Sequence, residues 1–216
     1  MNLIDVSWKF ATEDQCLDLL ETLRWPDGVR CPKFGTERVS RITRKQYNKN
    51  KRMRLYQCLA CKGLHFSTTS GTTFADSHLP LTKWFLAIGF MLNAKKGLSA
   101  KQMQRDLGCG YQTAWYLCHR VRKAIEEGDL PKFTIREWAR GKIHTNCIEN
   151  FWSLFKRALM GSFHKVSVKH LPRYLAEFTY RFNRREEENL FVQTLVRLSG
   201  TATMPYRNVV ANEQAW

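Results

Sequence analysis

The chain has 216 residues, which is long enough for one or two globular domains with a buried core. Its 35 Lys and Arg outnumber 19 Asp and Glu, and the resulting net charge of +16 predicts a polyanionic partner, most often nucleic acid, with a ribosomal or merely basic soluble protein as the alternative. No run of about 20 apolar residues occurs, so no membrane span is expected, and cysteines without a secretion signal favour a reducing, cytoplasmic compartment.

The first 28 residues predict one N-terminal helix. The segment ATEDQCLDLLETLRW opens with a capping box between Thr12 and Gln15. Apolar side chains then recur at helical spacing, and Pro26 and Gly28 end the pattern.

Residues 29–76 predict a small zinc-ribbon-like β unit. Cys58 and Cys61 form a C-x-x-C turn, and CPKFG has the frame of a second such turn, but Phe34 stands where its second cysteine would be. The candidate zinc ligands are therefore Cys31, Cys58 and Cys61, with His65 as a conceivable fourth. The alternative is a ribbon that has lost its metal and packs Phe34 in its place.

Residues 77–127 predict a helix after Pro80 and then a helix-turn-helix. Ser99 can cap the first helix of the pair, Gly108 and Gly110 make a short turn, and Tyr111 begins the second helix. The side chains expected to face inward are Ala100, Met103, Leu107, Ala114, Leu117 and Val121. An ordinary helical hairpin remains the alternative.

The second helix of this pair is the candidate recognition helix. The side chains expected to face outward and to contact base edges and phosphates in a major groove are Gln112, Thr113, Tyr116, His119 and Arg120. Lys95, Lys96 and Lys101 are expected mainly to hold phosphates.

Residues 128–143 predict a junction, and residues 144–216 predict a helical C-terminal segment. In the stretch HTNCIENFWSLFKR, Glu149 and Lys156 lie seven residues apart with Ser153 between them, so all three project from one polar face. That geometry suits one carboxylate at a metal and one lysine at a phosphate. A solvated amphipathic helix has the same pattern, and geometry alone favours it.

Buried stripes and a cationic surface are also expected in this segment. The first stripe comprises Ile148, Trp152, Phe155 and Leu159, and the second comprises Leu171, Leu175, Phe178 and Phe182. Only one acid, Glu177, occurs between Lys156 and Arg185. The bases expected outside, on DNA phosphates, are Lys156, Arg157, Lys165, Lys169, Arg173, Arg181, Arg184 and Arg185.

Long strings cover most of residues 15–185 in a fixed order: CPKFG, YQCLACKGLHFSTTSGTTFADSHLPLTKWFLAI, KKGLSAKQMQRDLGCGYQTAWYLCHRVRKAI and HTNCIENFWSLFKRALMGSFHKVSVKHLPRYLAEFTYRFNRR. In these strings the chain resembles the bacterial zinc-ribbon insertion-sequence transposases of the ISXO-like group (insertion-sequence family fifteen ninety-five). The resemblance implies a zinc ribbon and a helix-turn-helix ahead of a ribonuclease-H-like domain, whose DDE-type acids use divalent metal such as magnesium to nick and join DNA. It also places Glu149 at the third acid, with Asn146 and His144 beside it and Lys156 at the downstream basic position.

The interval before HTNCIEN is too short for the strands that would carry the two earlier acids. Only EEGDLPKFTIREWARGKI stands there, whereas one βαβ unit alone takes about 30 residues. Asp129 and Glu137 are the only acids between Glu127 and Glu149, and neither lies in a β-branched run. We therefore expect a large internal deletion that leaves Glu149 without partners for two-metal chemistry.

The expected fold is mixed and mainly α: an N-terminal helix, a zinc-ribbon-like β unit, a helix-turn-helix and a truncated remnant of a ribonuclease-H-like α/β domain. The expected function is binding of double-stranded DNA, with the element's terminal repeats as target, at the bacterial nucleoid. The alternatives are an active transposase whose missing acids come from self-association or a full-length partner, a repurposed DNA-binding regulator, and a decayed product without a role.

Overall fold

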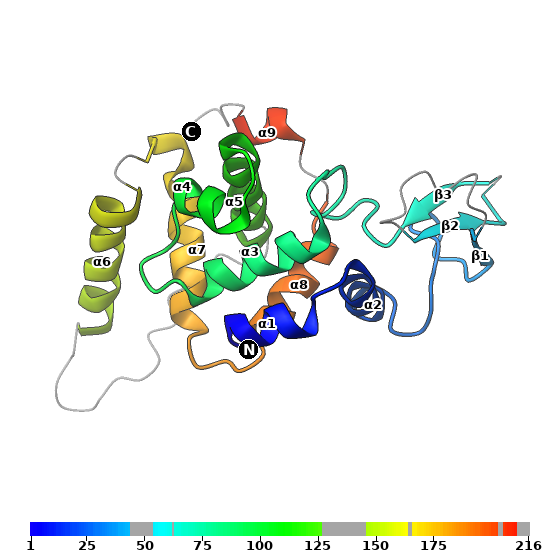
Figure 1. Cartoon of the computed structure of the whole chain (residues 1–216), viewed down its shortest axis with the longest axis horizontal. Helices are drawn as coiled ribbons and strands as arrows, with labels where there is room; N and C mark the ends of the chain where they lie inside the picture. The colour runs from blue at the N-terminus through cyan, green and yellow to red at the C-terminus, as the bar shows by residue number, and fades with distance from the viewer. Residues whose placement is uncertain (44–53, 62, 127–145, 164–165, 203–204, 211–216) are drawn as a thin grey trace.

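The computed structural model describes residues 1–43, 54–61, 63–126, 146–163, 166–202 and 205–210, and for residues 146–149 it describes the backbone alone. The chain is mainly helical with one small sheet (Figure 1). Its elements are α1 (Leu3–Lys9), α2 (Glu13–Arg24), β1 (Val39–Arg41), β2 (Leu55–Cys58), β3 (His65–Ser67), α3 (Leu81–Asn93), α4 (Ala100–Leu107), α5 (Tyr111–Glu126), α6 (Asn146–Ala158), the π-helical turn η1 (Leu159–Phe163), the 3-10 turn η2 (Val168–His170), α7 (Leu171–Asn183), α8 (Leu190–Gly200) and α9 (Tyr206–Val210). No helix in the described ranges is long and apolar enough to cross a membrane.

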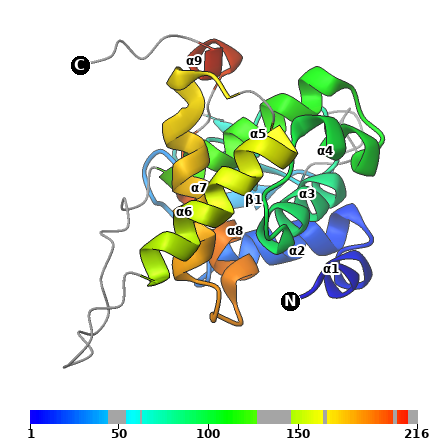
Figure 2. The same cartoon turned by 90° about the vertical axis from the view of Figure 1, so that its left-hand side faces the viewer.

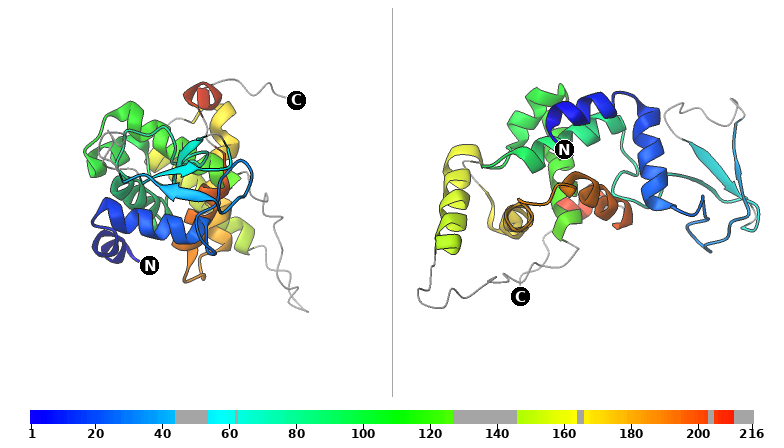
Figure 3. Two further views of the ribbon diagram at one scale, coloured as in Figure 1. Left: turned by 90° about the vertical axis from the view of Figure 1, so that its right-hand side faces the viewer. Right: turned by 90° about the horizontal axis from the view of Figure 1, so that it is seen from below.

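The sheet is an antiparallel meander in the order β1-β2-β3, and it stands at one end of the molecule, beyond α2 (Figures 1 and 3). It has a small core of its own. Tyr56 on β2 lies opposite Phe66 on β3, their rings stack with centroids 5.8 Å apart, and Cys31 and Cys58 are buried beside them. The β unit predicted between residues 29 and 76 is thus present.

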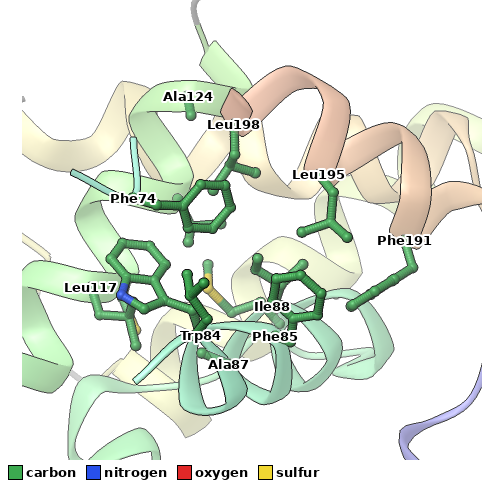
Figure 4. Packing of buried hydrophobic residues seen from close by; sticks show 14 of the residues in the cluster. Phe74, Trp84, Phe85, Ala87, Ile88, Leu117, Ala124, Phe191, Leu195 and Leu198 are labelled. Carbon is green, nitrogen blue, oxygen red and sulfur yellow. The ribbon is translucent and has the colours of Figure 1, made fainter. Parts of the chain in front are cut away.

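Helix α5 lies at the centre of the helical body, where it contacts α3, α4, α7, α8 and α9. The largest hydrophobic core forms around it (Figure 4). In this core Trp84 from α3 and Leu117 from α5 meet Leu198 from α8 and Phe74 from the loop before α3. Helix α8 also packs against α2 and α3. Segments on both sides of residues 128–143 therefore share one core.

A second core joins α6 to α7, at the opposite end from the sheet (Figures 1 and 2). Phe151, Phe155 and Ala158 are buried against Phe178 of α7. Trp152, which was predicted in the buried stripe, is 43% exposed, so that part of the prediction was wrong. The helix turns the neighbouring residue, Phe151, toward α7 instead.

A buried ion triad ties α5 to α7. The Glu177 carboxylate accepts a 2.6 Å hydrogen bond from Nε of Arg122, and Nη2 of Arg181 lies 3.1 Å from its other oxygen. Both guanidiniums also donate to backbone carbonyls between α3 and α4, Arg122 to Leu98 and Arg181 to Ala94. Burial alone would lower the pKa of Arg122, but the adjacent carboxylate raises it, so the guanidinium stays charged.

The sequence predicted that both bases of α7 lie on the surface, but neither of them does. Arg181 belongs to the triad, and Arg173 is buried, with its Nη1 donating to the carbonyl of Val209 at 3.1 Å. The prediction was wrong because it treated α7 as a helix with one buried side. In the structure α5 and α6 both pack on α7, and the segment around α9 lies against Arg173.

We expect Glu177→Ala to lower the free energy of unfolding by about 3–5 kcal/mol, because it leaves two buried guanidiniums without a carboxylate. Urea denaturation followed by circular dichroism measures the change. The control is Glu187→Ala, which removes an exposed acid 3.7 Å from Arg184 and should cost at most about 1 kcal/mol. Equal losses in the two variants would contradict a structural role for the triad.

Candidate DNA-binding surface and zinc site

The helix pair α4–α5 has the local features of a helix-turn-helix. The side chain of Ser99 caps α4 by accepting from the backbone N–H of Gln102, and Gly108 ends α4 in the left-handed region with φ 57°. Nζ of Lys83 donates to the carbonyl of Leu107 at 2.7 Å and so satisfies the end of the helix. The turn predicted around Gly108 and Gly110 is confirmed.

The inward face of the pair also follows the sequence pattern. Met103, Leu107, Ala114, Leu117 and Val121 are buried, whereas Ala100 is partly buried. These side chains lock α4 onto α5 and fix which residues of α5 are free to face solvent.

The start of α5 presents a polar, exposed surface. Gln112 and Thr113 are exposed in its first turn, and Lys95, Lys96 and Lys101 are exposed on the segment that precedes it. The sequence interpretation missed Arg105, which is exposed in the last turn of α4. Its position three residues before Gly108 was the sequence signal that placed it in the last turn of this helix.

Arg120 does not face outward, so the prediction for its side chain was wrong. It is 1% exposed, and its guanidinium donates to the carbonyls of Thr73 and Ala75 and lies 5.2 Å from the ring centroid of Trp84. The loop before α3 folds over this side of α5 and covers it. Arg120 therefore attaches that loop to α5, and its buried guanidinium is not exposed for a base contact.

His119 was also expected outside and is fully buried. Its ring lies between Trp115, at 4.2 Å, and His170, at 4.6 Å between centroids. Desolvation, reinforced by the charge of Arg122, lowers the pKa of His119 to about 2, so the ring is neutral at physiological pH. Tyr116, in the same predicted set, is only partly buried.

The candidate catalytic residues that the structure describes lie along α6, with Asn146 and Glu149 in its first turn and Lys156 in its last. Lys156 and Ser153 are exposed on this helix, as the polar-face pattern predicted. Asn146 and Glu149 begin the helix, but their side chains lie outside what the structure describes, as does all of His144. Asp129 and Glu137 also lie outside the described residues.

The remaining bases of the C-terminal segment give a smaller cationic surface than the sequence predicted. Of the predicted bases, Lys156, Arg157, Lys169 and Arg185 are exposed. Arg184 is partly buried, with Nε 3.7 Å from a Glu187 oxygen, and Lys165 lies outside the described residues.

Three cysteines meet beside the sheet. The sulfurs of Cys31, Cys58 and Cys61 all lie within 4.8 Å of one another, and Cys31 Sγ is 3.6 Å from Cys61 Sγ. Zn–S bonds of about 2.3 Å at tetrahedral angles place two sulfurs about 3.8 Å apart. Desolvation and the two neighbouring thiols raise the pKa of Cys61 to about 12, which disfavours its thiolate. A bound cation would favour the thiolate instead. The three residues thus fit a zinc ion.

The fourth ligand is not supplied by the residues that the sequence suggested. His65 is exposed on β3 and is not part of the cysteine cluster, so its prediction as a fourth ligand was wrong for this conformation. Phe34 is 69% exposed, which also contradicts the alternative in which its ring packs in the place of the metal. Backbone pairing holds His65 opposite Gln57, so its side chain cannot turn to the cluster without a change of register.

An acidic network fixes the β unit on α2. Nη1 of Arg54 lies 2.9 Å from a Glu21 oxygen, and the hydroxyl of Tyr56 donates to the other oxygen at 2.8 Å. Burial and the Glu21 carboxylate raise the pKa of Tyr56 to about 12, so its hydroxyl remains a donor. Thr68 donates to Glu21 as well, at 2.9 Å. Sequence reasoning missed Glu21, because its partners lie more than 30 residues away.

We expect Phe34→Cys to tighten zinc binding and to raise the thermal stability of the ribbon, because metal affinity in so small a unit is folding free energy. Zinc stoichiometry after chelator treatment and the melting temperature measure the two effects. Phe34→Ser is the matched control, since it removes the ring without adding a thiolate. If both variants bound zinc equally, the fourth position would not be a ligand site.

Comparison with known proteins finds family matches for two parts of the chain. The model of the transposase zinc-ribbon domain matches residues 11–63, and that of the ISXO2-like transposase domain matches residues 124–183. The chain is 29% identical over 123 residues to an uncharacterized protein in transposable element ISH50 of Halobacterium salinarum. That match covers 57% of this chain and 38% of the relative. No solved structure matches.

Both family models describe domains of the same group of transposases, and together they span more than half of the chain. The three-cysteine cluster falls in the range of the first model, and α6 and α7 fall in the range of the second. The chain therefore belongs to the family of zinc-ribbon, ISXO2-like insertion-sequence transposases.

Proposed function

We propose that this chain binds the duplex DNA of an insertion sequence, with the terminal repeats as its target, and that it does not cut or join DNA by itself. The observation that carries the proposal is the exposure of Gln112 and Thr113 at the start of α5, in a helix pair with a short turn and a chain of net charge +16. The first turns of such a second helix are the part that enters the major groove. The family match supports DNA as the partner.

Base recognition falls to the uncharged side chains. The amide of Gln112 offers a donor and an acceptor that suit N6 and N7 of adenine, and the hydroxyl of Thr113 suits either kind of base. Lys101 and Arg105, on α4, supply charge for the phosphates that flank the groove. Lys95 and Lys96 extend that phosphate contact beyond α4.

We expect Gln112→Ala to weaken binding to the preferred duplex by about 1–3 kcal/mol and to relax sequence discrimination. Lys101→Ala should weaken all duplexes alike and reduce the slope of log affinity against log salt by about 0.9. The preferred duplex is first selected from a random pool, and fluorescence anisotropy then gives the affinities.

Gln193→Ala is the matched control for this test, because Gln193 is exposed on α8, outside the helix pair. It should leave both affinity and discrimination unchanged. If Gln112→Ala behaved like this control, α5 would not be the recognition helix. A salt-independent affinity would remove the electrostatic part of the proposal.

Catalysis by this chain alone is limited by its acids. Two-metal strand transfer needs several carboxylates that hold cations about 4 Å apart. Of the described acids in and after α5, Glu126 lies near Lys123 and Arg173, and Glu177 is buried in the triad. The other three, Glu186, Glu187 and Glu188, are exposed after α7, where Glu186 lies near Arg185 and Glu187 near Arg184. Glu149, at the third acid by resemblance, would offer one carboxylate, and Lys156 and Asn146 would accompany it as vestiges of the site.

We expect Glu149→Gln to change neither DNA affinity nor the background nicking of the purified protein, because one carboxylate cannot fix the geometry on which strand cleavage depends. Labelled duplex carrying the selected site is incubated with magnesium or manganese, and the products of parent and variant are compared. Specific cleavage by the parent that is lost in Glu149→Gln would overturn this half of the proposal. Cleavage that appears only with a full-length relative would support complementation by a partner subunit.

A further inference from the structure

Helix α9 lies against α5 (Figure 1). The ring of Tyr206, at the start of α9, packs edge-on against Tyr116 with centroids 5.6 Å apart and against Trp115 at 6.3 Å. Val209 of the same helix is fully buried. Helix α9 is therefore docked on α5 and is not a loose tail.

The contact falls on the face that carries the candidate base contacts. Gln112 and Tyr116 are four residues apart on α5, so they share one face, with Gln112 one turn nearer the start of the helix. Tyr206 covers the second of these positions and leaves Gln112 and Thr113 exposed. The exposed surface for a major groove is thus one turn long while α9 is in place.

Cations hold the other end of α9. Nζ of Lys169 donates to the carbonyl of Val210 at 2.8 Å, and Nη1 of Arg173 donates to that of Val209 at 3.1 Å. Cations are favourable at the C-terminal carbonyls of a helix. A phosphate oxygen carries a negative charge, so these cationic donors interact with it more strongly than with a neutral carbonyl oxygen.

The width of the major groove limits what can enter it together with α5. The major groove of B-DNA is about 12 Å wide, and one α-helix with its side chains is about 10–12 Å across. A groove that accepts α5 as far as Tyr116 has no room for a second helix on the same face. Helix α9 and full insertion of α5 are therefore mutually exclusive.

We infer that α9 is an autoinhibitory cover of the recognition helix, which duplex DNA must displace. The inference rests on the proposed binding of DNA through α5. DNA entering over Tyr116 displaces Tyr206, and the release of the α9 carbonyls makes Lys169 available to phosphate. The affinity of the covered protein is then reduced by the fraction of molecules in which α9 is released.

The test compares Tyr206→Ala with Tyr206→Phe in the full chain. Tyr206 is 54% exposed, so its loss should leave the fold intact, and neither change alters the net charge. Removing the ring weakens two edge-to-face contacts and should tighten binding to the selected duplex about three- to tenfold, whereas the phenylalanine variant keeps the contacts and should bind like the parent. Anisotropy measures the affinities.

Hydrogen–deuterium exchange of Asn208–Val210 gives a second, independent measurement. Saturation with duplex should increase the exchange of these amides. Unchanged exchange with bound DNA, or equal affinities of parent, Tyr206→Ala and Tyr206→Phe, would overturn the cover while leaving DNA binding intact. If no variant bound duplex at all, the proposed function itself would fall, and the inference with it.

Discussion

The Glu177 carboxylate, buried between Arg122 and Arg181, is the interaction on which the helical body depends. It joins α5 to α7, and through the two guanidiniums it also fixes the backbone between α3 and α4 at Ala94 and Leu98. A buried charge of either sign is costly without its partner, so all three ionic side chains must be kept together. This constraint positions the helix pair α4–α5 relative to the segment matched by the ISXO2-like model.

The same constraint helps to hold together a continuous core from segments on both sides of residues 128–143. Helix α5 contacts helices from before and after residues 128–143, and α8 completes the core with Leu195 and Leu198. The C-terminal helices therefore support α5 directly. At the other end of the chain, Glu21 gathers Arg54, Tyr56 and Thr68, so that α2 carries the β unit as a fixed attachment to the body. In both places one acid organises elements that are distant in sequence.

Local features of the fold could be predicted from the sequence, because they depend on near neighbours. The cap at Ser99, the left-handed turn at Gly108 and the cysteine spacing around Cys58 all followed from residues within a few positions. The burial of Arg120 could not, because the carbonyls that receive it belong to a loop some 45 residues earlier. The lone acid Glu177 in a basic stretch is a sequence signal of a buried partner, and a count of charges alone does not use it.

For the candidate site, the sequence predicted the helices but not which of their faces are exposed. Gln112 and Thr113 are exposed as expected, whereas His119 is enclosed by aromatic rings from α5 and the segment before α7. A helical pattern gives one buried side, and α5 is covered on several. Because α5 is covered on these sides, its exposed polar side chains Gln112 and Thr113 are confined to the first turn, where the proposed contact with DNA lies.

The most direct test is site-specific photo-crosslinking from that turn. A benzoylphenylalanine is introduced at position 112, and in a second protein at position 193 on α8, and each is irradiated with the selected duplex. If α5 enters the groove, position 112 should crosslink to bases of the selected site and position 193 should not. Crosslinking from position 193 alone, or from neither position while the duplex is bound, would contradict recognition of DNA by α5.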